Sequence, residues 1–345
     1  MKKSRLTNTL PTQATVSHAW LQPDFDYPLN DHSRVSGFYH PWPIPRPEVD
    51  VWDWFMHRQP AKWPTWEENP VVTTLPTAKP DAHLDDWQAW FVGHATVLLR
   101  IGSAFILTDP VWAMRASPLP FAGPKRVRAA GLALAQLPKI DAVLLSHNHY
   151  DHMDVAALRW LHARDQMPIF AGLVNSQYLP KDMQVIELDW WQQAVIPNHP
   201  QLNVVFTPAQ HFSGRGLKDR NLALWGGLSV ITASQDHFFF AGDTGYSAHF
   251  AQIKDRLGAP RLALLPIGAY EPRSVMRAMH MDPFEAVQAH IDLAAKQSLA
   301  IHYRTFQLTD EAMNQPLLDL AQALTQHGLD PACFATPLEG EHLVV

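Results

Sequence analysis

The sequence predicts an αββα sandwich, an α/β fold in which two β-sheets pack face to face with helices on the outside. Short apolar runs of the kind that buried strands form recur in both halves of the chain. Helical patterns fall between or after these runs. A strand-rich first half followed by a similar second half favours two packed sheets over one doubly wound sheet.

The first predicted strands are two β-rich runs that form a hairpin around Gly102-Ser103 and end at Asp109. Further short apolar runs are expected to be strands at 141–145, 203–206, 228–232, 238–241, 262–265 and 299–301. Helices are expected at 155–163, 248–256, 283–296 and 310–327. The third of these helices begins with Asp282-Pro283, an N-cap residue followed by a proline in the first turn.

The segment 18–80 is rich in proline and tryptophan and has little apolar periodicity. We therefore expect it to be irregular and to pack on the core, as part of an extension that spans residues 1–85. Two interpretations of its tryptophans stay open. The rings either cover the edge of the core or form an aromatic surface that contacts lipid.

The composition is that of a globular protein. Of its 345 residues, 47% are hydrophobic and 17% are charged, which is enough apolar material for a full core. The formal net charge of −6 argues against a protein that coats nucleic acid, because such binding requires clustered Lys and Arg. A small phosphate-bearing substrate held by a metal is compatible with this charge.

Cys333 is the only cysteine, so the chain has no internal disulfide and no pair of thiolates for a metal. We expect this thiol to be buried and inert, and any metal to be held by histidines and carboxylates. The segment 7–17 is polar where a signal peptide needs an apolar run, and no stretch approaches the roughly 20 apolar residues of a membrane span. We therefore expect a cytoplasmic protein, with peripheral contact to a membrane left open.

The most informative stretch is the loop 146–154, which is expected between a buried strand and a helix. Within it, His147 and His149 alternate along extended backbone, so they can share one metal. The turn into the helix presents Asp151 and His152 to a second metal. Imidazole and carboxylate suit zinc, and also iron or manganese. Four coordinating residues within six positions have no packing purpose, so the string favours a metal site.

Three later residues supply ligands that this loop lacks. His211, Asp243 and His302 each lie just past the end of a predicted strand and would converge at one edge of the sandwich. Asp243 lies between Gly242 and Gly245, which permit close approach, and it is the natural bridge between two metals. Taken singly, each histidine is more often structural and the aspartate a turn former. Together with the loop, they predict a two-metal site.

These residues resemble those of the metallo-β-lactamase superfamily, whose fold is of the αββα type. Longer segments are similar to one family within it, the N-acyl-phosphatidylethanolamine-hydrolysing phospholipases D. The matching segments are 90–96, 115–118, 123–126, 146–152, 188–191, 239–246 and 266–273. The resemblance starts near Gly37 and implies a metallo-β-lactamase-like hydrolase domain over residues 86–345.

The resemblance implies a zinc phosphodiesterase that hydrolyses N-acyl-phosphatidylethanolamine, or a related phospholipid, to N-acylethanolamine and phosphatidic acid. It also implies two zinc ions per chain, with iron or manganese as alternatives, and a homodimer. By position, one zinc is expected on His147, His149 and His211, the other on Asp151, His152 and His302, and both on Asp243.

Other residues take roles by the same resemblance. Asp109 matches the aspartate that supports the metal loop from behind, and His94 is expected beside it around the metals. Tyr150 matches a tyrosine that lines the pocket, and His280 a histidine beside the substrate phosphate. Arg304 departs from the family, in which the last predicted metal ligand is usually followed by Trp-Gly-Thr. It could add a cation for the phosphate or point into solvent.

The expected nucleophile is a hydroxide that bridges the two metals, which lower the pKa of bound water. Asp151 and Asp243 act in catalysis through the metals, while a protonated His280 would stabilise charge on the phosphoryl oxygens. Two alternatives stay open. One is another hydrolase of the same fold, such as a lactonase, a nuclease or a small-molecule phosphodiesterase. The other is a metal-stabilised binding protein without turnover, although a structural zinc normally has a closed cage of four ligands.

Overall fold

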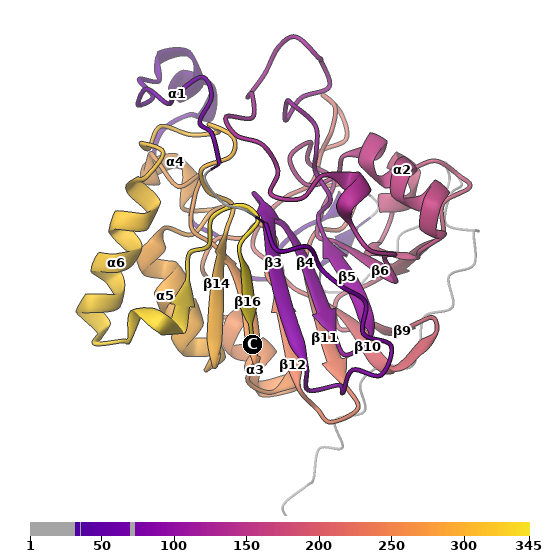
Figure 1. Ribbon diagram of the computed structural model, residues 1–345. Helices are drawn as coiled ribbons and strands as arrows, with labels where there is room; N and C mark the ends of the chain where they lie inside the picture. The colour runs from indigo at the N-terminus through magenta and orange to yellow at the C-terminus, as the bar shows by residue number, and fades with distance from the viewer. Residues whose placement is uncertain (1–31, 35, 70–72) are drawn as a thin grey trace, which may run out of the picture.

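The computed structural model describes residues 32–34, 36–69 and 73–345. The segment 7–17, which carries the expectation about a signal peptide, lies outside the described residues. Two mixed sheets of seven strands each form the centre of the molecule, and helices lie on both outer sides (Figure 1). The predicted αββα sandwich is therefore confirmed.

The first sheet has the strand order β16-β3-β4-β5-β6-β7-β8. Its strands are β3 (Trp87–Gly93), β4 (Thr96–Ile101), β5 (Ala104–Thr108), β6 (Ala142–Leu145), β7 (Ile169–Gly172), β8 (Val185–Leu188) and β16 (His342–Val344). The predicted hairpin around Gly102 joins β4 to β5. The run before it contains a further turn at His94-Ala95, which the sequence pattern hid because the residues on both sides are buried and mostly apolar.

The second sheet has the strand order β15-β14-β13-β12-β11-β10-β9. Its strands are β9 (Gln193–Ile196), β10 (His199–Thr207), β11 (Gly227–Thr232), β12 (His237–Phe240), β13 (Leu262–Pro266), β14 (Gln297–Ile301) and β15 (Phe334–Ala335). The sequence pattern did not reveal β7, β8, β9, β15 or β16, each of which has at most four residues.

Helices cover both outer faces. α2 (Val155–Asp165) packs on the first sheet, and α3 (His249–Leu257), α5 (Pro283–Leu293) and α6 (Gln315–His327) cover the second (Figure 1). The remaining short helices are α4 (Arg273–Met276), η2 (Leu134–Gln136), η3 (Asn175–Tyr178) and η4 (Pro331–Cys333). α6 begins later than the expected residue 310, because the side chains of Asp310 and Glu311 are engaged elsewhere and Pro316 sits in the first turn.

The N-terminal segment is less irregular than expected. It contains β1 (Ser33–Arg34), β2 (Gly37–Phe38) and the helix α1 (Val51–His57), which no sequence pattern indicated. Asp50 caps α1 by accepting hydrogen bonds from two backbone N–H groups of its first turn. Trp54 Nε1 and Arg58 Nε donate to the two carboxylate oxygens of Asp310 at 2.7 and 2.8 Å. These hydrogen bonds attach α1 to Asp310, a residue far along the chain.

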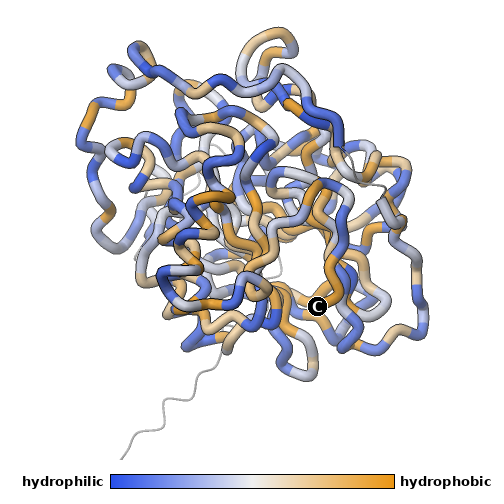
Figure 2. The backbone as a smooth tube through the Cα atoms, turned by 60° about the vertical axis from the view of Figure 1, so that its left-hand side comes forward, coloured by the Kyte–Doolittle hydropathy of each residue, from blue (hydrophilic) through white to orange (hydrophobic). Residues whose placement is uncertain are grey.

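Apolar side chains of both sheets fill the space between them, and Figure 2 shows the hydrophobic segments gathered inside the molecule. The N-terminal tryptophans differ in their surroundings, and the interpretation that they cover the edge of the core applies to Trp42 but not to Trp52. Trp42 stacks on Trp190 at 5.6 Å and packs against the core, whereas Trp52 is 71% exposed. Cys333 is only partly buried, and burial raises the pKa of its thiol.

Candidate metal centre

The strands that precede the predicted ligands all end at one edge of the sandwich. β5 is parallel to β6, and β3 runs in the same direction because β4 is antiparallel to both of its neighbours. In the second sheet β12, β13 and β14 are parallel. β10 runs in the same direction as these strands because β11 is antiparallel to both β10 and β12. The residues after these strands therefore emerge at the carboxyl edges of the two packed sheets, as the sequence predicted.

Asp109, directly after β5, holds the loop that follows β6. Its Oδ1 accepts a hydrogen bond from the backbone N–H of Ser146 at 2.8 Å, and its Oδ2 accepts one from Ser146 Oγ at 2.5 Å. The same Oδ2 lies 2.6 Å from His152 Nδ1, which leaves His152 Nε2 directed toward the centre. Asp109 is fully buried, in the position that the family resemblance implied.

Three imidazoles converge on one side of the centre. His149 Nδ1 lies 2.8 Å from His147 Nε2 and 3.3 Å from His211 Nε2. The other nitrogen of His211 contacts the Met279 carbonyl at 2.9 Å, which fixes the orientation of that ring. Ligand atoms 2.0–2.1 Å from a tetrahedral zinc ion are about 3.3 Å apart, so these three nitrogens fit one ion.

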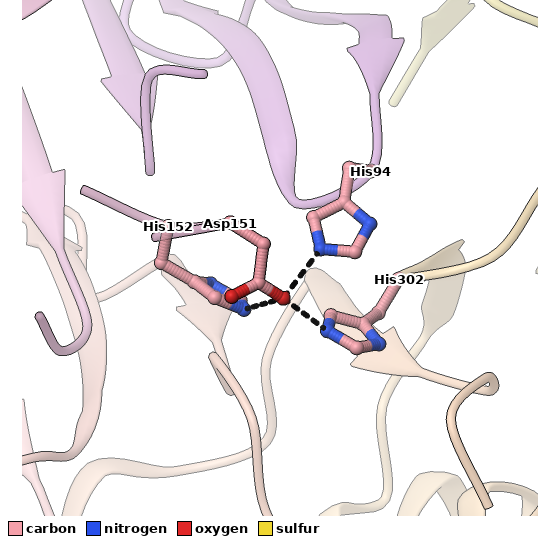
Figure 3. A group of neighbouring side chains, drawn as sticks. All are labelled: His94, Asp151, His152 and His302. Atoms are coloured by element: carbon pink, nitrogen blue, oxygen red, sulfur yellow. Dashed lines mark hydrogen bonds and ion pairs between the residues drawn. The ribbon is translucent and has the colours of Figure 1, made fainter. Parts of the chain in front are cut away.

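A second group surrounds Asp151. Its Oδ2 lies 3.1 Å from His94 Nε2, 3.4 Å from His302 Nε2 and 3.5 Å from His152 Nε2 (Figure 3). All four side chains are buried and their ligand atoms lie within 4.8 Å of one another. This group has the donors for a second ion.

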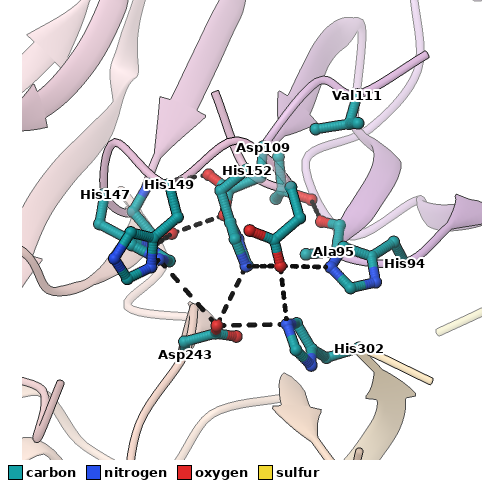
Figure 4. A network of polar contacts seen from close by, with 12 residues as sticks. His94, Ala95, Asp109, Val111, His147, His149, His152, Asp243 and His302 are labelled. Atoms are coloured by element: carbon teal, nitrogen blue, oxygen red, sulfur yellow. Dashed lines mark hydrogen bonds and ion pairs between the residues drawn. The ribbon is translucent and has the colours of Figure 1, made fainter. Parts of the chain in front are cut away.

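Asp243 lies between the two groups (Figure 4). Its Oδ2 is 3.1 Å from His152 Nε2 and 3.2 Å from His302 Nε2 on one side. On the other side it is 3.7 Å from His211 Nε2 and 4.0 Å from His147 Nε2. The carboxylate is therefore placed as a bridging ligand would be. Gly242 makes this approach feasible, since it has φ +61° and a Cβ there would lie 2.5 Å from Ser146 Cβ.

Burial and charged neighbours set the ionisation of these groups, and His302, which they keep protonated, must lose its proton to bind a metal. Burial lowers the pKa of His149 to about 4 and that of His211 to about 3, so both imidazoles are neutral and free to bind a cation. Burial would raise the pKa of Asp243, but His152 and His302 hold it well below its ordinary value. Burial opposes protonation of His302 too, yet Asp243 raises its pKa to about 9.

Unsatisfied polar atoms at the centre agree with a bound cation. His152 Nε2, His302 Nε2 and Asp243 Oδ1 are buried without a hydrogen-bond partner among the described residues. Such atoms are rare in proteins because each costs about 1–3 kcal/mol. A metal ion coordinated by these atoms would remove that cost, and nitrogen with carboxylate oxygen suits zinc, iron and manganese alike.

Backbone conformation at the centre is unusual. His94, Asp109 and His302 have φ values of 58°, 27° and 63°, in the left-handed region that residues other than glycine rarely adopt. Residues held there cost about 1–3 kcal/mol each and cluster at functional sites. Apart from the family resemblance, no sequence pattern indicated His94, because this residue lies inside an apolar run.

His280 lies beside the predicted ligands, with its Nδ1 4.0 Å from Asp243 Oδ2. Burial lowers the pKa of His280 to about 3, which favours a neutral imidazole over the expected protonated one. A neutral ring can still donate one hydrogen bond. Its Nδ1 is buried and has no partner among the described residues.

Two residues expected at the substrate are placed elsewhere. The Tyr150 hydroxyl donates to the Arg215 carbonyl at 3.0 Å, and the Arg215 guanidinium lies 4.0 Å above the tyrosine ring. The Arg304 guanidinium is 3.8 Å from Glu67 Oε1 of the N-terminal segment. Neither Tyr150 nor Arg304 is among the described residues that line the cavity over the centre.

That cavity has a volume of about 450 Å³. We call the predicted metal ligands together with Asp109 the floor of the site. We call the apolar residues that the N-terminal segment contributes to the cavity the rim, namely Ile44, Pro45, Pro47, Val51 and Trp54. The cavity thus joins a buried ionisable floor to an apolar rim.

Comparisons with known proteins agree with this arrangement. The β-lactamase superfamily domain matches residues 105–303. An uncharacterized protein of Mycobacterium tuberculosis is 38% identical over 282 residues, which are 78% of this chain and 72% of its own. N-acyl-phosphatidylethanolamine-hydrolyzing phospholipase D 1 of Caenorhabditis elegans is 38% identical over 265 residues, 73% of this chain and 74% of its own. A solved metallo hydrolase of Ignicoccus hospitalis has a TM-score of 0.56 at 24% identity and covers 75% of this chain and 98% of its own.

The chain therefore belongs to the metallo-β-lactamase superfamily and is a metal-dependent hydrolase. This excludes the alternative of a binding protein without turnover. Within the superfamily, the chain is close to the N-acyl-phosphatidylethanolamine-hydrolysing phospholipases D.

Proposed function

We propose that the chain is a zinc-dependent phosphodiesterase of the phospholipase D type. Its substrate is N-acyl-phosphatidylethanolamine or a related phospholipid, and its products are N-acylethanolamine and phosphatidic acid. The observation that carries this proposal is the cavity, because it places an apolar wall directly over the candidate metal ligands. The name of the C. elegans relative supports the substrate class.

In this proposal the floor would hold two zinc ions, with Asp243 available to both. When bound, such a pair supplies a nucleophile by lowering the pKa of water and neutralises charge on the phosphoryl oxygens. The chain itself orients the ligands, since Asp109 fixes His152 and the Met279 carbonyl fixes His211. Neutral His280 donates a hydrogen bond to a phosphoryl oxygen, which stabilises the charge that builds there.

The apolar part of the cavity receives the acyl chains. Ile44 and Val51 of the rim line the cavity together with Met276 and Leu308 from the C-terminal half. Each methylene group buried between such side chains contributes about 0.8 kcal/mol. A lipid substrate would therefore bind more tightly than a short phosphodiester with the same head group.

We also propose that α1 contacts the lipid surface from which the substrate comes. Trp52, Phe55 and Met56 are 71%, 56% and 59% exposed, while Val51 and Trp54 of the same helix line the cavity. An exposed apolar face of this kind is unusual unless it meets a partner or a membrane. Among the described residues, no helix has the length and apolar character needed to cross a bilayer.

The test uses N-acyl-phosphatidylethanolamine in mixed micelles, with water that carries oxygen-18. The expected result is N-acylethanolamine without label and phosphatidic acid with one labelled oxygen, because attack occurs at phosphorus. Asp243→Asn and chelator-treated enzyme are the controls, and elemental analysis should give two zinc ions per chain. Hydrolysis of a lactone without cleavage of any phosphodiester would contradict the proposal and favour the other hydrolases of this fold.

A further inference from the structure

The segment that follows His211 carries two arginines in opposite situations. The Arg215 guanidinium points into the protein, where its Nη1 donates to the carbonyls of Asn148 at 2.8 Å and Met153 at 2.9 Å. Its face lies 4.0 Å above the Tyr150 ring. Arg215 therefore holds the metal loop through Nη1, and this side chain has a structural explanation.

Arg220 has no such explanation. Its guanidinium lies 4.0 Å above the Phe212 ring and lines the cavity. Among the described residues, no carboxylate lies within ion-pair distance of it and no acceptor takes its hydrogen bonds. Arginine offers five donors in a planar fork that matches phosphate and carboxylate oxygens. Arg220 is exposed at the cavity, so its guanidinium is accessible to an anion that enters there.

The position of Arg220 relates it to the floor. The Phe212 ring beneath it packs against His149 at 4.5 Å and His211 at 4.8 Å between ring centroids. The Phe212 ring therefore contacts both Arg220 and two candidate metal ligands. No other lysine or arginine lines the cavity within the described part of the chain.

A second polar group shares the cavity with Arg220. His40 lines the same cavity, and burial together with the positive charge of Arg220 lowers its pKa to about 4, so this imidazole is neutral. Its Nε2 is buried and lacks a partner among the described residues. Arg220 and His40 therefore both offer unused hydrogen-bonding atoms to a molecule in the cavity.

We propose that Arg220, with His40 beside it, binds a negatively charged phosphoryl oxygen of the substrate and thereby selects anionic diesters over neutral esters. This inference rests on the proposed function for the identity of the substrate. It assigns Arg220 to substrate binding rather than to bond cleavage, so its loss should raise KM more than it lowers kcat.

The test compares two variants. Arg220→Gln keeps a long polar side chain but removes the positive charge, and Arg220→Lys keeps the positive charge but removes the planar guanidinium. Arg256→Gln is the matched control, because Arg256 also lies over an aromatic ring, Trp191 at 4.2 Å, but does not line the cavity. The probes are the lipid substrate, a short chromogenic phosphodiester and inorganic phosphate as a competitive inhibitor. Metal content and melting temperature are measured on every variant.

We expect Arg220→Gln to raise KM for both diesters and the inhibition constant of phosphate about tenfold, with metal content and melting temperature unchanged. Arg220→Lys should recover part of this loss, and Arg256→Gln should match the wild type. Unchanged constants in Arg220→Gln, or loss of metal from it, would overturn the proposal. If the wild type cleaves a lactone but no diester, the proposed function fails. Phosphate inhibition of that lactone reaction then still tests Arg220.

Discussion

The floor and the rim of the cavity are held in place by different means. On the floor, Asp109 is fully buried and engages Ser146 and His152 through contacts of 2.8 Å or less. On the rim, α1 has no buried residue and depends on Trp54 and Arg58 for its attachment. The difference separates two tasks. Rigid, buried groups hold the candidate metal ligands in position. An exposed segment forms part of the substrate-binding surface and can vary in sequence at little cost to the stability of the fold.

The largest effect should come from the floor residue between the two groups of ligands. Asp243→Asn keeps the shape of the side chain but removes the charge that a bridging ligand needs, so kcat should fall by about 10³-fold or more. The melting temperature should change little. Kinetics, calorimetry and elemental analysis on one preparation check this, and an active mutant with full metal content would remove Asp243 from the bridging role.

His280→Ala comes next. The side chain contacts the candidate ligands without belonging to the expected set, so metal content should persist while kcat falls about 10²-fold through loss of one hydrogen bond to the transition state. Steady-state kinetics and elemental analysis measure both quantities. A purely structural histidine would instead lower the melting temperature and leave turnover per folded molecule unchanged.

Asp109→Asn should lower the metal affinity of the floor, because Asp109 orients residues of the metal loop. One carboxylate oxygen is replaced by an NH2 group, which donates hydrogen bonds and cannot accept them, so metal affinity should fall about 10- to 100-fold. Competition with a chelator measures the affinity. Asp141→Asn is the control, because its carboxylate accepts a hydrogen bond from the Phe105 N–H away from the site and should affect stability alone. Equal metal affinity in the two variants would contradict the role of Asp109.

The smallest effect should come from the rim. The double substitution Ile44→Ala with Val51→Ala removes apolar contacts, so KM for a long-chain lipid should rise about 3- to 10-fold. A short phosphodiester should be hydrolysed as before. Leu318→Ala is the control, because Leu318 is equally apolar and 64% exposed but lies on α6. If a rim variant changes KM equally for both substrates, the proposal that the floor and the rim have different roles is contradicted.

The sequence predicted the floor better than the rim, and the reason is physical. Ligands such as His147 and Asp151 lie within a few residues of each other, and His211 follows a strand whose direction the sheet topology dictates. Their convergence follows from local pattern and fold class. The rim and Arg220 become neighbours only through tertiary contacts between distant segments, which no local pattern encodes.

The errors have the same origin. Tyr150 and Arg304 lie close in sequence to metal ligands, yet the first contacts Arg215 and the second lies against Glu67. Sequence proximity to a ligand therefore did not give the direction of a side chain. His94 shows the converse, because a turn hidden in an apolar run brings it 3.1 Å from Asp151.

The attachment of α1 also has a consequence for biosynthesis. The rim is translated early, but Trp54 and Arg58 find their acceptor only at Asp310, more than 250 residues later. On the ribosome, the cavity therefore cannot be completed until nearly the whole chain has emerged. The apolar face of α1 stays without its anchor throughout that interval, so chaperone binding to the nascent chain should concentrate on this segment.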